Sequence, residues 1–238
     1  MKIASLYGDS HSLLFKKFNP ETFQFNLHPI IGSTISGLPR RDSTLQVGNK
    51  IRKELREVNV DTLCLKLGQV DIELGFFYKK IVKKQNLEIT PYIELLVETY
   101  FEFINSLAKE FKGEIVVLGL NLPASLGKEA IEYPKQYLIP ALKGKERAEA
   151  LKQLEENFPG IKERTQQHLK FNDLVEKACE NTSIRYADIT TPFLDEKTGI
   201  IKKEFSDEKD HHYKGLVYNK EFNLAFEVFN KLLLEALK

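Results

Sequence analysis

The N-terminal stretch Ile3-Ala4-Ser5-Leu6-Tyr7-Gly8-Asp9-Ser10-His11-Ser12 joins a short apolar run to a cluster of small polar residues. An apolar run that ends in Gly-Asp-Ser is typical of a buried strand whose last residues turn sharply at the edge of a sheet. In such a turn the Ser10 hydroxyl would face a pocket, which makes Ser10 a candidate nucleophile. Gly, Asp and Ser also form ordinary turns. A functional role for Ser10 therefore depends on partners elsewhere in the chain.

Four further apolar runs predict strands, at residues 23–27, 60–67, 114–121 and 183–189. Patterns of helical spacing separate or follow them, at residues 13–18, 45–58, 90–112, 161–181 and 219–237. Strands that alternate with helices predict an α/β protein with a parallel sheet covered on both faces. We expect one domain over residues 1–238, in which residues 123–160 form a lid or an insertion around a short charged helix.

The polar loops after the first three predicted strands hold Ser10, Gly37 and Asp71. In open parallel sheets, ligands bind beyond the carboxyl ends of the strands. The three loops are therefore expected to meet at one edge of the sheet and to form a site there.

The charge balance excludes several classes of partner. Thirty-five basic and thirty-four acidic side chains leave a net charge of +1, so no electrostatic footprint for nucleic acid or an anionic membrane is present. Cys64 and Cys179 are far apart and lack the spacing of a metal knuckle or a redox pair. The sequence has neither a secretion signal nor a long apolar segment, so we expect a soluble, cytoplasmic protein without nucleic-acid or membrane partners.

A serine nucleophile needs a neighbouring base, and the five histidines are the candidates. His28 and His168 are expected at a strand edge and in a helix, and His11 directly follows Ser10. The pair His211-His212 lies in a charged loop before the last helix, where it can reach over the edge of the sheet. The base is therefore expected to be one of these two.

With these residues the chain resembles the SGNH (GDSL) hydrolases, a superfamily whose sequence blocks are spread over nearly the whole domain. Gly8-Asp9-Ser10 matches the nucleophile block, and Ser36-Gly37 is similar to the second block. Gly68-Gln69-Val70-Asp71 takes the place of the third block, Gly-x-Asn-Asp, and Asp210-His211-His212 that of the C-terminal Asp-x-x-His. The resemblance implies a three-layer α/β/α sandwich around a five-stranded parallel, flavodoxin-like sheet, in agreement with the five strands counted above.

The resemblance also implies acyl transfer through Ser10, with His212 as general base and Asp210 holding the imidazole tautomer. The spacing departs from the family pattern, because Lys209 is three residues before His212. His211, with the carboxylate of residue 207 or 208, stays open as the alternative base.

The oxyanion hole implied by the family consists of the amides of Ser10 and Gly37 and one side-chain amide. Val70 stands where the family has the asparagine that supplies this amide, and a valine side chain cannot donate a hydrogen bond. Gln69 is expected to reach the oxyanion instead. Losing one such donor costs about 100- to 1,000-fold in turnover.

Asp9 is expected to orient the nucleophile turn, and Asp71 to brace its own loop. No cofactor and no metal are implied for this reaction. The expected substrate is a small soluble ester, such as an O-acetylated sugar. The sequence does not indicate an oligomeric state.

Other classes of protein stay open. Asp9-Ser10-His11 contains the Asp-x-His that opens the site of calcineurin-like metallophosphoesterases, and Asp210-His211-His212 could add ligands for a divalent metal. The further motifs of that family are absent. A non-catalytic protein of the SGNH fold, or an acyltransferase with a sugar acceptor, is compatible with the same residues.

Overall fold

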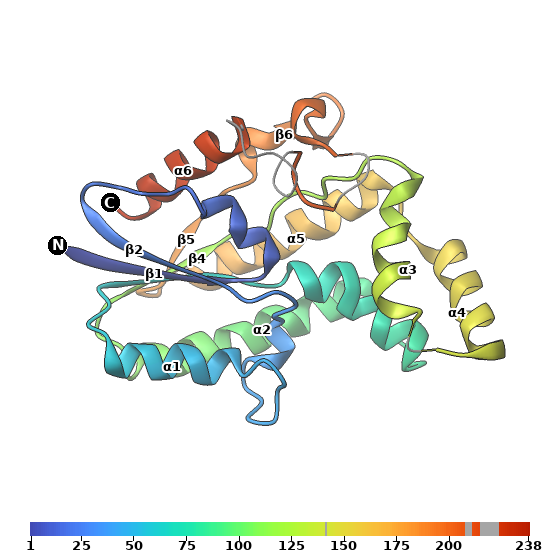
Figure 1. Ribbon diagram of the computed structural model, residues 1–238, viewed down its shortest axis with the longest axis horizontal. Helices are drawn as coiled ribbons and strands as arrows, with labels where there is room; N and C mark the ends of the chain where they lie inside the picture. Colours follow the sequence, from blue (N-terminus) through green and yellow to red (C-terminus); the bar gives the residue numbers. More distant parts are fainter. Residues whose placement is uncertain (141, 208–210, 215–223) are drawn as a thin grey trace.

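The computed structural model describes residues 1–140, 142–207, 211–214 and 224–238. Its centre is a five-stranded sheet in the order β2-β1-β3-β4-β5, with every neighbouring pair parallel (Figure 1). The strands are β1 Lys2–Gly8, β2 Phe23–Pro29, β3 Thr62–Lys66, β4 Glu114–Leu118 and β5 Arg185–Ala187. The predicted parallel α/β sheet is thus confirmed.

Helices cover both faces of the sheet, as a three-layer sandwich requires (Figure 1). One face carries α1 Val47–Glu57, α2 Ile89–Ala108 and α5 Ile161–Cys179, and the other carries the 3-10 helix η1 Ser10–Phe15 and α6 Leu224–Ala236. The sequence predicted a helix start at residue 219, which lies outside the described residues, whereas α6 is described from Leu224.

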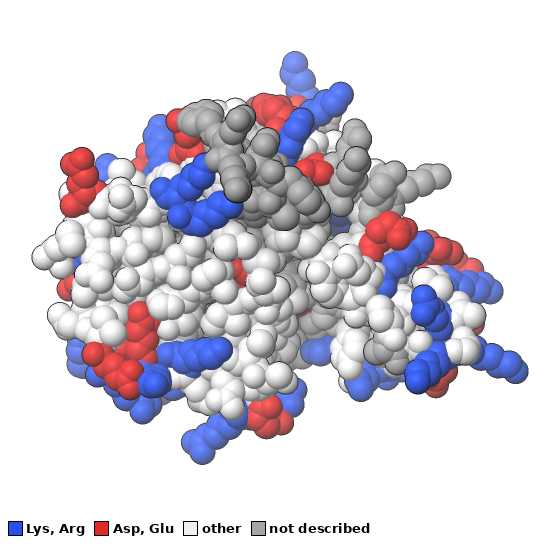
Figure 2. Space-filling model, viewed as in Figure 1, with Lys and Arg blue, Asp and Glu red and all other residues white. Residues whose placement is uncertain are grey.

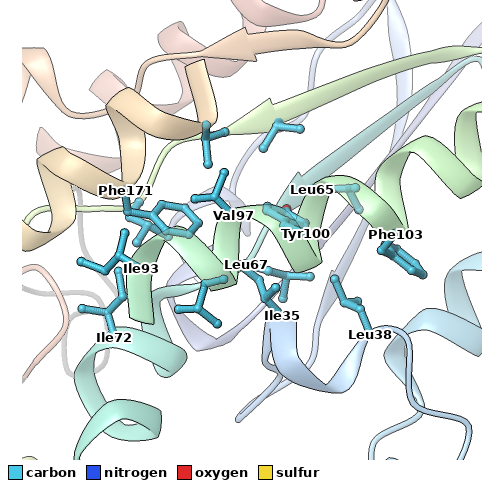
Figure 3. Close-up of a cluster of buried hydrophobic side chains, with 14 of the residues drawn as sticks. Ile35, Leu38, Leu65, Leu67, Ile72, Ile93, Val97, Tyr100, Phe103 and Phe171 are labelled. Carbon is cyan, nitrogen blue, oxygen red and sulfur yellow. The ribbon is translucent and has the colours of Figure 1, made fainter. Parts of the chain in front are cut away.

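Alternating side chains on the central strand β3 divide the hydrophobic core in two. Leu63 and Leu65 are buried on the side of α2, whereas Cys64 is buried on the side of α6. In the first cluster, Leu65 lies beside Tyr100 of α2, and Phe171 of α5 packs nearby (Figure 3). Each fully buried side chain of this size contributes about 1.5–3 kcal/mol. The sheet is therefore fixed from both sides, and its carboxyl edge becomes a rigid base for the loops.

The segment over residues 123–160 is more regular than the sequence suggested. It contains η5 Lys128–Ile131, α3 Glu132–Leu138 and α4 Gly144–Asn157. The charged helix α4 was predicted, whereas α3 was not, since it contains Pro134 and a proline disfavours the interior of a helix. Pro134 lies in the first turn of α3, where its missing N–H has no helical acceptor to lose. Lys135 of α3 forms ion pairs with Glu132 at 3.2 Å and with Glu155 of α4 at 2.9 Å.

Several short elements complete the described chain. They are η2 Ile35–Gly37, the π-helices η3 Asp71–Gly75 and η4 Tyr78–Val82, the turns η6 Thr191–Phe193 and η7 Lys203–Phe205, and an antiparallel pair of β6 Leu194–Asp195 and β7 Ile200–Ile201. The β6–β7 pair was not predicted, because two-residue strands are too short to show a period. Among the described residues, no helix is both long and apolar enough to cross a bilayer.

Candidate active site

The turn after β1 places Ser10 at the carboxyl edge of the sheet. A Cβ on Gly8 would lie 2.6 Å from Ser12 Cβ and 2.9 Å from the Lys66 carbonyl oxygen, so only glycine fits where β1 ends. Asp9 then caps η1, because its Oδ1 accepts a hydrogen bond from the His11 backbone N–H at 2.9 Å. Ser10 is the first residue of η1 and is 8% exposed. The polar turn predicted from the sequence is thus also a helix start.

His212 is the histidine that meets Ser10. Its Nε2 lies 3.0 Å from Ser10 Oγ, although the two residues are 202 positions apart in the chain. Both side chains are buried. The neighbouring His211 ring instead stacks on Tyr133, with centroids 3.5 Å apart and planes within 16°. The geometry therefore joins a hydroxyl to an imidazole as a serine–histidine pair would need.

The carboxylates expected to orient the base cannot be placed. Asp210 and residue 208 lie outside the described residues. Asp207 is described, and its backbone N–H donates to the Ala124 carbonyl at 3.2 Å. The third member of the triad stays a prediction from the sequence.

Asp71 joins the third loop to the second. Its carboxylate accepts hydrogen bonds from Ile35 N at 2.7 Å, Ser36 Oγ at 2.8 Å and Ser36 N at 3.3 Å. Burial raises the pKa of the Asp71 carboxyl to about 6, although these hydrogen bonds oppose the rise. The carboxylate holds η2 against the start of η3, which is the kind of contact expected of a bracing residue.

Gly68 allows the chain to turn from β3 toward Asp71. Its φ is +119°, a conformation that disfavours side chains, and a Cβ would lie 2.9 Å from the Phe171 ring. The glycine of the third block is therefore required both by the backbone and by the packing of α5.

Two of the three predicted oxyanion donors have other acceptors. Gln69 Nε2 donates to Glu73 Oε1 at 2.8 Å and to the Asn121 carbonyl at 3.4 Å. An amide nitrogen has two hydrogens, so both are engaged in these contacts, and the role of Gln69 as an oxyanion donor stays a prediction. The Gly37 N–H is shared between the carbonyl and the hydroxyl of Thr34, each at a long 3.2 Å. A small shift of η2 would release this N–H.

The buried charges beneath the turn support one another. Burial by itself raises the pKa of Asp9, but the His11 side chain and the Lys66 ammonium outweigh this effect and lower it below the ordinary value. Burial lowers the pKa of Lys66, which is fully buried at the end of β3. Lys66 Nζ has no hydrogen-bond partner among the described residues, so its effect on Asp9 is electrostatic rather than through a hydrogen bond.

A cavity of about 350 Å³ opens beside the two adjacent histidines. His211 and His212 are among the residues that line it. An aromatic wall is formed by Phe77, Tyr133, Tyr137 and Phe158, and polar groups are contributed by Glu73, Ser125, Arg164, Gln167 and His168. Over the face shown in Figure 2, basic and acidic side chains are mixed without a continuous patch of one sign. The cavity, rather than a charged surface, is the natural place for a ligand.

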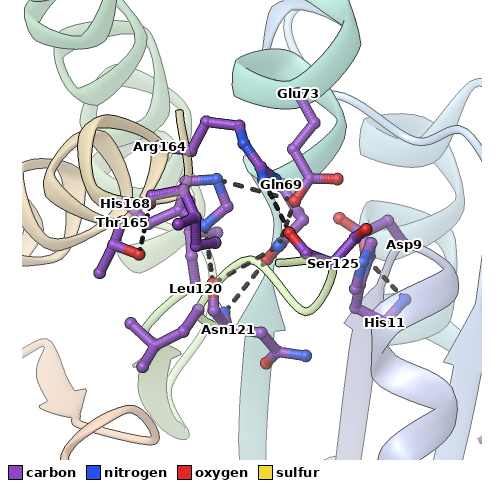
Figure 4. Close-up of polar contacts among 12 residues, drawn as sticks. Asp9, His11, Gln69, Glu73, Leu120, Asn121, Ser125, Arg164, Thr165 and His168 are labelled. Atoms are coloured by element: carbon purple, nitrogen blue, oxygen red, sulfur yellow. Dashed lines mark hydrogen bonds and ion pairs between the residues drawn. The ribbon is translucent and has the colours of Figure 1, made fainter. Parts of the chain in front are cut away.

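The polar end of this cavity is held by one face of α5. Arg164, His168 and Asn172 follow one another at intervals of four residues, and each bonds the loop after β4 (Figure 4 shows the first two). Arg164 Nη2 donates to the Ser125 carbonyl and His168 Nδ1 to the Asn121 carbonyl, both at 2.7 Å. We call residues 120–125 and 164–172 the pocket side, and residues 8–12, 35–37 and 71 the nucleophile side.

Asn172 makes the third contact between α5 and the loop after β4. Its side-chain amide accepts from Leu120 N at 2.6 Å and donates to Leu120 O at 3.2 Å. His168 was expected in a helix without a role in the site, and no role was predicted for Arg164 or Asn172. The available signal was a row of polar residues four apart on a helix that must bury one face.

Glu73 is one of two carboxylates of the described chain that line the cavity, the other being Glu132. Burial alone raises the pKa of Glu73, but the nearby histidines 11, 168 and 211 and the hydrogen bond from Gln69 lower it below the ordinary value. Burial lowers the pKa of His168, whose Nδ1 donates to the Asn121 carbonyl and whose Nε2 lies 3.7 Å from Glu73 Oε1. Among the described residues, Glu73 Oε2, Ser125 Oγ and Arg164 Nε have no hydrogen-bond partner. These atoms form a ready set of groups for a polar ligand.

No family model matches the chain, and no curated protein is significantly similar to it in sequence. Solved structures are similar in fold. A GDSL-like lipase from Bacteroides thetaiotaomicron superposes with a TM-score of 0.57 at 12% identity, covering 99% of this chain and 87% of its own. An extracellular lipase from Streptomyces rimosus gives 0.53 at 14% identity, with 99% and 100% covered.

A catalytic mutant of an acetylxylan esterase from Geobacillus stearothermophilus gives a TM-score of 0.53 at 10% identity, covering 99% of this chain and 94% of its own. Identities this low establish the arrangement of the chain in space and leave its activity open. Together with the sheet order, these matches show that the protein has the fold of the SGNH (GDSL) hydrolases.

Proposed function

We propose that the protein is a serine esterase that cleaves small soluble esters such as O-acetylated sugars. The observation that carries the proposal is the 3.0 Å contact between Ser10 Oγ and His212 Nε2 at the carboxyl edge of the sheet. The fold supports it, because structures of the same fold include lipases and an acetylxylan esterase.

In the proposed mechanism, Ser10 Oγ attacks the ester carbonyl while His212 Nε2 accepts the hydroxyl proton. The bond to the alcohol oxygen then breaks as His212 returns the proton to it, and an acyl-Ser10 remains. Water, or a second alcohol in the case of acyl transfer, removes the acyl group by the reverse proton path. The backbone amides of Ser10 and Gly37 are proposed to stabilise the oxyanion, and Asp210 to hold the tautomer of His212.

The proposed substrate class follows from the cavity beside His212. Its volume of about 350 Å³ is at the lower end for ligand pockets, which favours a small ester over a long acyl chain. The ring faces of Tyr133 and Phe158 offer apolar contact for the C–H face of a sugar. Arg164 and Glu73, which line the same cavity, offer a donor and an acceptor for hydroxyl groups.

The proposal is tested by hydrolysis of p-nitrophenyl acetate and labelling with a fluorophosphonate. Ser10→Ala is expected to lower kcat/KM about 10⁴-fold and to abolish labelling. Ser12→Ala is the matched control, because Ser12 Oγ donates to the Asp9 carbonyl at 2.7 Å and does not contact His212. It is expected to keep the label and to stay within about tenfold of wild type. Wild-type turnover in Ser10→Ala would refute the serine mechanism.

A panel of acyl chain lengths tests the substrate class. Acetyl esters, including O-acetylated sugars, are expected to be cleaved faster than octanoyl or longer esters. Rapid cleavage of long-chain esters together with inert acetyl esters would leave Ser10 as nucleophile but exclude the proposed class.

A further inference from the structure

Three imidazole rings meet beside the nucleophile, although the proposed mechanism uses only one of them. His11 comes from the first turn of η1, and His211 and His212 come from the loop before α6. One potential ligand nitrogen of each ring lies within 4.8 Å of those of the other two. The His11 ring centroid is 4.6 Å from that of His212 and 5.4 Å from that of His211.

His11 is oriented as a metal-binding histidine would be. Its Nδ1 lies 3.2 Å from Asp9 Oδ1, so the carboxylate fixes the tautomer with the proton on Nδ1 and the lone pair on Nε2. His11 is 1% exposed, and its Nε2 has no hydrogen-bond partner among the described residues. A buried acceptor left in this state is destabilising, and a bound cation would satisfy it.

We propose that His11, His211 and His212 form a binding site for a divalent transition metal, with Zn²⁺ as the preferred ion. Three neutral imidazole nitrogens suit zinc and exclude magnesium and calcium, which require oxygen ligands. Tetrahedral Zn–N bonds of about 2.0–2.1 Å place the nitrogens about 3.4 Å apart. The ligand nitrogens, which lie within 4.8 Å of one another, therefore need to approach by up to about 1.4 Å when the metal binds. A water molecule or a substrate oxygen would take the fourth position.

Metal binding opposes the proposed esterase activity. A neutral imidazole has one lone pair, and His212 needs it to accept the Ser10 proton. When the metal takes this lone pair, the ring keeps its proton on the other nitrogen and cannot act as a base. Zn²⁺ is therefore an inhibitor that acts at the base. This consequence rests on the proposed function, whereas the metal site itself does not.

The site is tested first by binding alone. Chelator-treated protein is titrated with Zn²⁺ in competition with a fluorescent chelator, and with Co²⁺ to record the visible absorption of a four-coordinate ion. One equivalent is expected to bind. His11→Gln removes a ligand and is expected to weaken binding at least 100-fold, and Asp9→Asn, which removes the carboxylate beside His11 Nδ1, about 10- to 100-fold.

His28→Gln is the matched control. His28 lies on the edge strand β2, stacks on Tyr7 and makes no contact with the three histidines of the cluster. It should bind Zn²⁺ as wild type does. Circular dichroism checks that each variant is folded. Equal affinity of wild type and His11→Gln, or no binding by wild type, would overturn the site.

The inhibition is tested separately, by the rate of p-nitrophenyl acetate hydrolysis at increasing free Zn²⁺. Half-inhibition of wild type is expected at the Kd measured by binding, and His11→Gln is expected to require at least 100-fold more metal. Activation by Zn²⁺ would overturn the inhibitory role while leaving the site. An inactive protein that still binds one Zn²⁺ through His11 would refute the esterase proposal alone.

Discussion

The nucleophile side and the pocket side of the cleft are built by different kinds of contact. On the nucleophile side, Asp9 caps η1 through His11, two residues away, and Asp71 binds the turn at Ile35 and Ser36. On the pocket side, α5 reaches back 39 to 52 residues to bond the main chain after β4. On the nucleophile side, short polar turns position the reactive atoms. On the pocket side, the packing of helix α5 positions one wall of the cavity. We therefore expect substitutions to affect mainly turnover on the first side, and mainly stability and substrate binding on the second.

The largest expected difference in kcat/KM is between variants of two buried histidines. His212→Gln removes the base and is expected to lower kcat/KM for p-nitrophenyl acetate about 10³-fold. His168→Gln keeps a donor for the Asn121 carbonyl, which His168 Nδ1 contacts at 2.7 Å, and is expected to stay within about tenfold of wild type. Steady-state kinetics of both variants measure this contrast. Equal losses would mean that the two sides do not differ in the way proposed.

The nucleophile side could be predicted because its residue types are required locally. Close contacts require glycine at position 8, the cap of η1 requires a residue such as Asp9, and a positive φ favours Gly68. The residue types at these positions can therefore be read from the sequence. The five strands were predicted for the same reason, since each is a short apolar run between helices. What remained ambiguous was the choice between His211 and His212, because the direction of a loop side chain has no period.

The pocket side is marked only weakly in the sequence, by polar residues four apart on one helix, and the contacts of these residues become known only from the packing of the helix. Arg164 and Asn172 look like the solvated residues of any charged helix, and their partners are main-chain atoms that every residue has. Gln69 shows the same limit: its position suggested an oxyanion donor, but the loop after β4 provides acceptors that the sequence does not reveal. Pro134 is a further example, because the sequence does not show that this proline lies in the first turn of a helix, α3.

The second prediction concerns stability. Asn172→Leu keeps the number and branching of the side-chain heavy atoms but leaves the buried N–H and C=O of Leu120 without their partners. A loss of about 2–4 kcal/mol in the free energy of unfolding is expected. Ser36→Ala removes one of three hydrogen bonds to Asp71 and is expected to cost about 1 kcal/mol. Urea denaturation measures both, and the reverse order would contradict the role assigned to α5.

The third prediction uses two buried carboxylates, one beside each side of the cleft. Asp71 has a pKa raised from 3.8 to about 6, so the folded state holds its proton more tightly than the unfolded state does. Its contribution to stability is present at low pH and is lost as the pH rises through about 6. Relative to Asp71→Asn, wild type should therefore gain about 2 kcal/mol between about pH 7.5 and about pH 4.5.

Glu73 should show the opposite sign. Its pKa is lowered in the folded protein, so its contribution is present above the ordinary pKa and is lost as the pH falls. Relative to Glu73→Gln, wild type is expected to lose stability as the pH falls below about 4.5, the ordinary pKa of this carboxyl. Urea denaturation at each pH measures the two differences, and slopes of the same sign would contradict the charge environments described for these carboxylates.

The smallest expected effect is on substrate binding at the aromatic wall. Tyr133 lines the cavity, and a wall of this kind contacts the ground state and the transition state alike. Tyr133→Ala is therefore expected to raise KM for an O-acetylated sugar about three- to tenfold with kcat nearly unchanged. Tyr78→Ala is the control, because Tyr78 is 40% exposed on η4 and does not line the cavity. Tyr133 also stacks on His211, next to the proposed base. A fall in kcat at constant KM would thus assign Tyr133 to the nucleophile side, acting through the histidine pair.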